Sequence, residues 1–262
     1  MINYIVFDCE SVPDGKLINM VKYPDSPFDD EESIEAYKQE ILEGSQGKTD
    51  FISPIFQFPV AVSLAKIDEN YLIDDIVMLD SPEFRPQFIT ESFWKGLNHY
   101  KVPIVSFNGR GFDIPLLEAS AFRYGISASH NFNEKYGLRY RFGEKHIDLM
   151  DWITNYGAVR KGYSLDLLSK LLGKPGKMTT KGSDVYSMYR QGKIKEINEY
   201  CSFDVLDTYF IFLRSLVLKG QISIKEEQKI VGFAKEWLQN NLKRYPFLKQ
   251  YLDNWGDWTP WP

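Results

Sequence analysis

The sequence predicts a mixed α/β protein in which helices cover a β-sheet. The chain opens with a short, nearly continuous apolar run at residues 2–10, which is typical of a buried strand. Two further apolar runs, residues 59–67 and 71–79, are separated by a few polar residues and predict an antiparallel hairpin that joins the first strand. Residues 103–107 predict a later strand, and the helical spacing before residue 103 indicates a crossover to a parallel strand. Residues 146–152 predict a final short strand that enters a helical region.

Apolar residues at helical spacing predict the helices. Gly125 is a stop signal for one helix, and Ser164 is expected to cap the start of another. The longest helix carries an apolar stripe that includes Cys201 and Val205, and we expect this stripe to be its buried face. A basic loop is expected at residues 173–183. The expected helices span residues 33–43, 86–100, 112–124, 164–172, 194–218 and 223–243.

Length and composition predict one large folded domain. Of the 262 residues, 44% are hydrophobic and 26% are charged, which excludes a disordered, collagen-like or coiled-coil protein. We expect a single domain at residues 1–262 that includes a long acidic insertion at about residues 11–53 and a C-terminal helical extension from about residue 219.

Several protein classes are excluded. The longest strongly apolar stretch, residues 209–218, is interrupted by Arg214 and is shorter than the roughly 18 residues that a membrane span needs. The N-terminus has no basic start, so no secretory signal is expected and a cytoplasmic protein is predicted. Two cysteines are too few for a disulfide framework or a cysteine zinc site, and we expect Cys9 and Cys201 to be buried packing residues.

Charge is unevenly distributed along the chain. The net charge of −5 disfavours a protein that wraps nucleic acid in a positive coat. Residues 25–50 hold nine acidic and two basic side chains, whereas residues 160–195 hold nine basic and two acidic ones. A solvated face and a partner-binding surface explain each segment about equally well. The basic segment could follow the phosphates of a negatively charged substrate.

Four carboxylates and one phenol stand near the ends or faces of predicted elements. Asp8 and Glu10 lie two apart near the end of the first strand, so they share one face, where their repulsion is costly without a cation. Taken alone, such a pair is more often simply the mark of a strand end that turns to solvent. Asp113 begins a helix, where a carboxylate can also simply offset the helix dipole. Tyr200 and Asp204 lie four apart on one face of the long helix, which is also typical of an exposed polar edge. Each signal is weak, but the set indicates a metal-dependent site.

These residues resemble three motifs of a known enzyme family. Asp8-Cys-Glu10, Asn108-Gly-Arg-Gly-Phe112-Asp113 and Tyr200-Cys-Ser-Phe-Asp204 closely resemble the motifs of the DEDD 3'-to-5' exonucleases. The N-x-x-x-F-D form of the second motif resembles the proofreading domain of family-B DNA polymerases and stand-alone exonucleases similar to it. Glu199 stands where the histidine subtype has its histidine, which indicates the tyrosine subtype. The resemblance covers Ile2 to about Leu218 and implies a ribonuclease H-like fold.

The resemblance also implies a chemistry. Two divalent cations, Mg²⁺ or Mn²⁺, would be held by Asp8, Glu10, Asp113 and Asp204, with Asp8 bridging both. Tyr200 would orient the attacking water, because a phenol with a pKa of about 10 is an inefficient base at neutral pH. The resemblance further implies that Asn108 and Phe112 contact the terminal nucleotides. The chain has only three histidines, His99, His130 and His146, which is little material for a zinc cage.

The expected function is a metal-dependent 3'-5' exonuclease that releases nucleoside 5'-monophosphates from single-stranded DNA. An exoribonuclease is the alternative enzyme, because nothing in the sequence recognisably reads the 2'-hydroxyl. A non-catalytic nucleic-acid-binding module with the same fold is the alternative from another class. The expected partner is single-stranded nucleic acid, with DNA favoured over RNA, no membrane is involved, and no protein partner is indicated.

Two further groups of residues are open to more than one interpretation. Asp148 and Asp151, after the last strand, could join the acidic cluster or cap the next helix. The closing tryptophans could stack bases, but we favour docking of the tail onto the body of the protein. These tryptophans are Trp255, Trp258 and Trp261.

Overall fold

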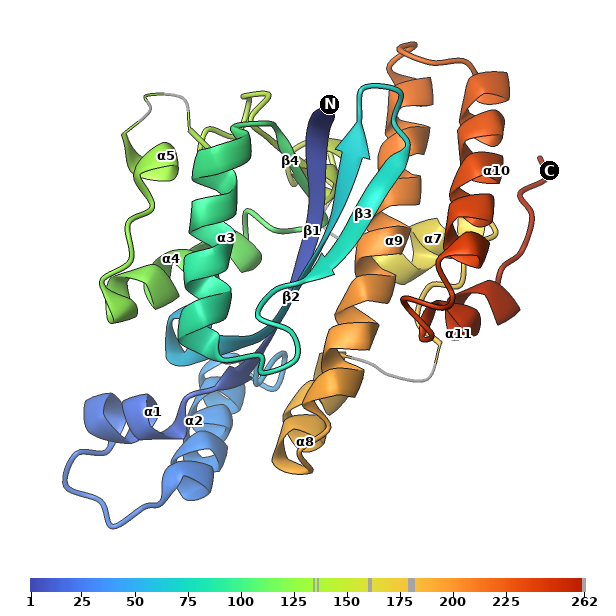
Figure 1. Ribbon diagram of the computed structural model, residues 1–262. Helices are drawn as coiled ribbons and strands as arrows, with labels where there is room; N and C mark the ends of the chain where they lie inside the picture. The colour runs from blue at the N-terminus through green and yellow to red at the C-terminus, as the bar shows by residue number, and fades with distance from the viewer. Residues whose placement is uncertain (134, 136, 160–161, 179–181, 261–262) are drawn as a thin grey trace.

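A five-stranded mixed sheet forms the centre of the computed structural model, which describes residues 1–133, 135, 137–159, 162–178 and 182–260. The strand order is β3-β2-β1-β4-β5. The first three strands pair antiparallel, and β4 and β5 continue the sheet in parallel with β1 (Figure 1). The expected ribonuclease H-like sheet is therefore confirmed. The strands are β1 (Ile2–Pro13), β2 (Gln57–Asp68), β3 (Ile73–Met78), β4 (Ile104–Ser106) and β5 (His146–Asp148).

Helices cover both faces of the sheet (Figure 1). One apolar core lies between the sheet and α3 and α4, and a second lies between the sheet, α9 and α10. Strand β1 contributes to both cores, because Phe7 faces the first and Val6 faces the second. The helices are α1 (Gly15–Lys22), α2 (Asp30–Gly44), α3 (Pro86–Tyr100), α4 (Asp113–Tyr124), α5 (Ser129–Phe132), α6 (Leu149–Ile153), α7 (Leu165–Leu171), α8 (Val185–Arg190), α9 (Ile194–Leu218), α10 (Ile224–Asn240) and α11 (Leu248–Asp253), with 3-10 turns η1 (Pro54–Phe56) and η2 (Gly182–Asp184).

Strand β1 is longer than expected. It continues to Pro13, because β2 pairs with it along its whole length, from Ile2 opposite Asp68 to Pro13 opposite Gln57. On its other side, β4 pairs with β1 only around residues 5 and 6. Residues 8 and 10 are therefore not at the end of the strand, as the sequence predicts, but lie beyond the end of the shorter neighbour β4.

The expectation of one buried stripe on α9 is wrong. Nearly every residue of the helix from Ile197 to Leu216 is buried, because the sheet covers one side while α7, α10 and α11 pack against the others. Glu199 and Arg214 are the exceptions on this stretch. The Arg214 guanidinium donates to both carboxylate oxygens of Glu227 on α10, at 2.7 and 2.9 Å. A helix buried on all sides loses the periodic pattern on which the expectation rests.

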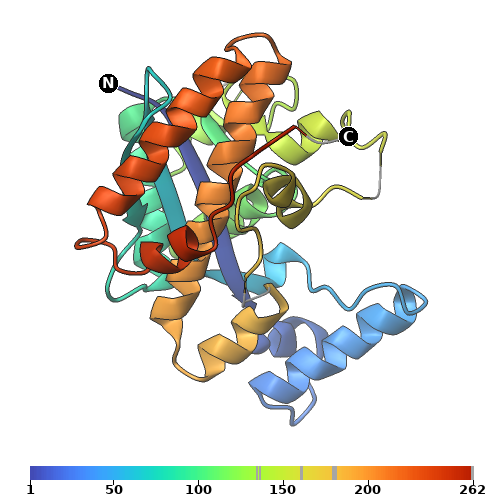
Figure 2. The ribbon, with the colours of Figure 1, turned by 90° about the vertical axis from the view of Figure 1, so that its right-hand side faces the viewer.

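The acidic insertion folds into a small helical unit of its own. The expected helix at residues 33–43 begins earlier, at Asp30, behind a capping box formed by Asp29 and Glu32, and α1 was not expected. The two helices project at one end of the molecule, beside α8 (Figures 1 and 2). Four buried side chains, which we call the insertion core, hold them together: Ile18, Ile34, Tyr37 and Ile52.

The C-terminal extension docks onto the body of the protein. The expected helix at residues 223–243 ends at Asn240, and α11 follows it. Trp255 packs against the core beside Phe210, with ring centroids 5.2 Å apart, and the Arg214 guanidinium lies 4.4 Å from the centroid of the Trp258 ring. Docking is thus confirmed for these two tryptophans. Trp261 lies outside the described residues, as do Arg160, Lys161 and Lys181 of the basic segment.

Smaller expectations are also settled by the structure. Ser164 caps α7 as expected, since its side chain accepts from the amide of Leu167. Both cysteines are buried and free. Within the described part of the chain, no helix combines the length and apolarity needed to cross a bilayer.

Candidate active site

Three carboxylates from two elements meet at the centre of the molecule. One oxygen from each of Asp8, Glu10 and Asp204 lies within 4.8 Å of the others. The two-residue spacing on β1 turns the first two carboxylates to the same face, and α9 crosses that face. The Cys201 thiol contacts the Asp8 backbone oxygen at 3.3 Å, so a small side chain stands where the helix approaches the strand. Asp204 is only 7% exposed, which rules out an exposed polar edge.

Asp113 adjoins this cluster from the start of α4. Its side chain is 3% exposed, and within the described part of the chain its Oδ1 atom has no hydrogen-bond partner. Burial raises the pKa of Asp113 to about 7, and the Asp113 charge in turn helps to raise the pKa of Asp8. A buried carboxylate oxygen without a partner is rare and indicates that something outside the protein can satisfy it.

Burial and mutual repulsion disfavour the ionised form of the whole cluster. Desolvation, followed by the nearby charges, raises the pKa values of Asp8 and Glu10 well above their ordinary range. Desolvation also raises the pKa of Asp204 to about 6, although a hydrogen bond from Tyr200 and the charge of Lys177 oppose the shift. A cation bound among these groups would remove the repulsion.

Tyr200 lies one helical turn before Asp204 and is buried. Desolvation, with the charges of Asp204, Glu10 and Asp8, raises its pKa above the ordinary tyrosine range. The phenol therefore stays protonated at neutral pH and can donate a hydrogen bond, but it cannot serve as a base.

The loop before Asp113 has a tightly determined backbone. Asn108 has a φ of +67°, and its amide and that of Arg110 donate to the two carboxylate oxygens of Asp148, at 3.0 and 2.9 Å. A Cβ atom at Gly109 would lie 2.3 Å from Ser106 Oγ and 3.2 Å from Asp113 Oδ2. Only glycine fits there, because any side chain would clash with Ser106 and press on the Asp113 carboxylate beside the cluster.

Replacing Gly109 with Ala is therefore expected to destabilise the protein by roughly 1–3 kcal/mol through overpacking. The matched control is Gly96→Ala in α3, where a Cβ would meet nothing within 4 Å. This control is expected to stabilise the helix by about 0.5–1 kcal/mol. Urea denaturation of both variants measures the two effects, and equal effects at the two positions would contradict the packing argument.

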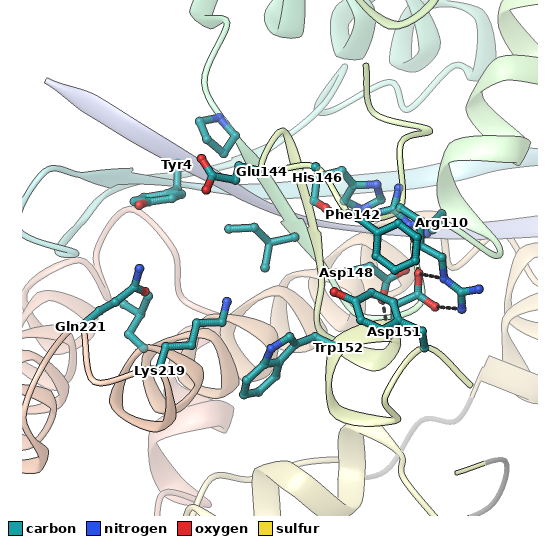
Figure 3. Close-up of a pocket in the computed structure, with 16 residues that line it drawn as sticks. Tyr4, Arg110, Phe142, Glu144, His146, Asp148, Asp151, Trp152, Lys219 and Gln221 are labelled. Atoms are coloured by element: carbon teal, nitrogen blue, oxygen red, sulfur yellow. Dashed lines mark hydrogen bonds and ion pairs between the residues drawn. The ribbon is translucent and has the colours of Figure 1, made fainter. Parts of the chain in front are cut away.

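Asp148 and Asp151 do not join the carboxylate cluster. Asp148 caps α6 by accepting from the amides of Met150 and Asp151, in addition to holding the loop. Asp151 pairs with Arg110 at 3.0 Å and with Arg141 at 2.6 Å, in a pocket behind that loop (Figure 3). The capping interpretation is confirmed for Asp148, and the strand predicted at residues 146–152 ends at this cap.

A cleft of about 620 Å³ opens onto the carboxylates. Asn108, which is exposed, and Phe112, which is half-buried, both line it. Four further residues in its wall are not singled out by sequence reasoning. Each lies outside the three motifs. Only Lys177 belongs to a segment for which the sequence indicates a role, the basic segment that could follow phosphates. They are Lys38 and Phe51 from the insertion, Lys177 from the basic loop, and Tyr186 from α8.

Comparison with known proteins identifies the family. Residues 49–255 match the family described as a predicted 3'-5' exonuclease related to the exonuclease domain of PolB. The chain belongs to this family. The match includes Asp113, Tyr200 and Asp204, whereas Asp8 and Glu10 precede it. Exonuclease domains of this kind use divalent metals, so family and carboxylate cluster agree in chemistry.

The other comparisons add little. Among the solved structures that match is the family B DNA polymerase from the hyperthermophilic archaeon Pyrobaculum calidifontis, with 16% identity and a TM-score of 0.49. The match covers 93% of this chain and 29% of the polymerase chain. No curated protein sequence matches the chain significantly.

Proposed function

We propose that this protein is a metal-dependent 3'-5' exonuclease that hydrolyses single-stranded DNA from its 3' end and releases nucleoside 5'-monophosphates, with residues 1–262 acting as one domain. The observation that carries the proposal is the approach of Asp8, Glu10 and Asp204 to within 4.8 Å in an open cleft. A module that only binds nucleic acid does not need desolvated, mutually repelling carboxylates, which would also repel the phosphates.

The donor set fits two hard divalent cations. All the candidate ligands are carboxylate oxygens, which Mg²⁺ and Mn²⁺ prefer, and the buried Asp113 Oδ1 atom has no partner among the residues that the structure describes. We propose that Asp8 serves both ions, that Glu10 and Asp204 complete one site, and that Asp113 supports the other. When bound, the ions would lower the pKa of the attacking water and neutralise charge on the leaving oxygen.

The chain's own residues would position the reactants. The Tyr200 hydroxyl, which is protonated and lies beside Asp204, would orient the water for attack on the phosphorus. Asn108 and Phe112 would hold the terminal nucleotides. Lys177 faces Glu10 and Asp204 closely enough to lower their pKa values, so its charge is also available to a scissile phosphate.

Tyr200→Phe is expected to lower kcat by roughly 10–100-fold, since it removes one orienting hydrogen bond but none of the proposed metal ligands. Mn²⁺ affinity, measured by calorimetry, should be unchanged. Tyr209→Phe is the matched control, because the Tyr209 hydroxyl donates to the Tyr71 backbone oxygen at 2.7 Å, away from the cluster. It should lower stability and leave kcat unaffected. A Tyr200→Phe enzyme at full rate would contradict the orienting role.

The function is tested with 5'-labelled single-stranded DNA and matched RNA, each with Mg²⁺, Mn²⁺ or EDTA. A metal-dependent ladder that shortens from the 3' end, faster on DNA, is the expected result. Faster shortening of RNA would instead assign an exoribonuclease. Absence of cleavage by a folded protein that binds Mn²⁺ would overturn the enzymatic proposal and favour a binding module.

A further inference from the structure

An aromatic side chain of the insertion lies exposed at the cleft. Phe51 is 58% exposed, and it lines the same cleft as the carboxylates. Its ring centroid lies 5.9 Å from that of Phe112, with 53° between the ring planes. Because the rings are tilted and not stacked, neither covers the face of the other. An exposed aromatic face beside a candidate catalytic cluster is what a stacking platform for a nucleobase requires.

The backbone that carries Phe51 is anchored to the strand of the carboxylates. The next residue, Ile52, is 3% exposed and belongs to the insertion core. Its backbone oxygen accepts from Gln57 Nε2 at 2.6 Å, and Gln57 Oε1 accepts from Ser11 Oγ at 2.6 Å. Ser11 directly follows Glu10 on β1. The backbone next to Phe51 is thus held relative to the carboxylates by a short chain of hydrogen bonds.

The insertion is also tied to α8, which contributes Tyr186 to the wall of the cleft. Arg190 of α8 pairs with Glu31 of α2 at 2.7 Å, and the Lys38 ammonium lies 5.6 Å from the centroid of the Tyr186 ring. Tyr186 itself packs against the insertion core. Helices α2 and α8 accordingly lie side by side in both views (Figures 1 and 2). Because the insertion is held both at Ile52 and at α8, it can present the Phe51 ring to a bound DNA strand at little cost in conformational entropy.

We infer that Phe51 is a substrate-binding residue, which stacks on a base near the 3' end of a single DNA strand and extends the contact surface of Phe112. The inference rests on the proposed function and assigns a role to the insertion, which the three motifs leave unexplained. Every base offers an aromatic face, so this contact would be independent of sequence. It also requires an unpaired and unstacked base, so it would favour single strands over duplex ends.

The test measures equilibrium binding of a 5'-fluorescein oligothymidylate in the Asp8→Asn background with Mn²⁺, so that cleavage does not interfere. Phe51→Ala is expected to weaken binding roughly tenfold, as the loss of one stacked base should. Phe51→Trp should bind at least as tightly as the parent. Ile55→Ala is the matched control, since Ile55 is 56% exposed but is not in the wall of the cleft. Its binding should stay within about twofold of the parent, as for a neutral surface change.

A second strand, with abasic sugars in place of its 3'-terminal bases, separates stacking from other effects. The parent should bind this strand more weakly, and Phe51→Ala should weaken its binding no further. If Phe51→Ala weakens the binding of both strands equally, the inference is overturned, because the ring would then affect binding through the cleft wall and not by stacking on a base. Failure of the proposed function has another signature: the Asp8→Asn parent with Phe51 intact would bind neither strand, and the wild-type protein would hydrolyse neither.

Discussion

Asp8→Asn is expected to lower kcat on single-stranded DNA by roughly 10³-fold, the largest effect of any substitution considered. A bound metal contributes several kcal/mol of charge stabilisation in a phosphodiester transition state, and about 4 kcal/mol corresponds to this factor. Asp8 lies at the centre of the cluster, where desolvation and the Asp113, Asp204 and Glu10 charges all raise its pKa. Removing its charge should therefore weaken Mn²⁺ binding along with the rate. Single-turnover cleavage and calorimetric metal titration measure the two effects.

The same substitution is expected to leave the metal-free fold intact or slightly more stable. The variant removes one half-buried, repelled carboxylate and no packing volume. Asp207→Asn is the matched control on α9. The Asp207 carboxyl is fully buried, but it accepts from the Tyr251 hydroxyl at 2.6 Å and is not among the clustered carboxylates. This control should retain activity. An Asp8→Asn protein that unfolds, or one that cleaves at the wild-type rate, would refute the proposed role.

The second large effect is an inverted dependence of stability on pH in the absence of metal. Burial raises the pKa values of Asp113 to about 7 and of Asp204 to about 6, from an unfolded value of 3.8. Between about pH 4 and 7 the folded state therefore binds protons that the unfolded state does not, and the free energy of unfolding falls as pH rises. The stabilising contribution is complete below the unfolded pKa and lost above pH 7. The total change should be a few kcal/mol.

Divalent cations should remove this dependence. Because a metal and a proton compete for the same carboxylates, the stabilisation by Mn²⁺ should grow as pH rises from 5 to 8. Guanidinium denaturation at several pH values, with EDTA and with Mn²⁺, measures both curves. Asp8→Asn should flatten the EDTA curve. A metal-free protein whose stability stays constant over this range, or a Mn²⁺ effect that is equal at every pH, would argue against the cluster as the metal site.

The sequence predicts a helix or strand well where its residue pattern depends only on that element itself. The alternating face of β1, the helix of α3 and the glycine stop of α4 depend on local spacing, and the structure confirms them. Element ends were less predictable. Strand β1 extends to Pro13 because β2 pairs with it, and β5 stops at Asp148 because that carboxylate caps a helix. These ends depend on partners that are remote in sequence.

The insertion and the cleft wall were beyond prediction for the same reason. Phe51 stands in a polar segment without periodicity, and nothing in the sequence places it beside Phe112, which is 61 residues away. In helix α9 the periodic pattern was misleading, because it predicted an exposed polar edge. The acidic residues that look like a polar edge are in fact inside, since Asp204 meets the carboxylates of β1 and Asp207 is buried against Tyr251 of α11.

The sequence by itself determined which reactive side chains are present and how they are placed locally: two carboxylates on one face of a strand, a third at the start of a helix, and a tyrosine one turn before a fourth carboxylate. These relations are local, since they follow from the periods of strand and helix. Only the tertiary structure decided that Asp8, Glu10 and Asp204 meet within 4.8 Å, that Asp148 serves the backbone instead, and that the insertion brings an aromatic ring to the cleft. Such meetings arise from the packing of remote segments around a shared core, and packing has no signature in any one of the segments.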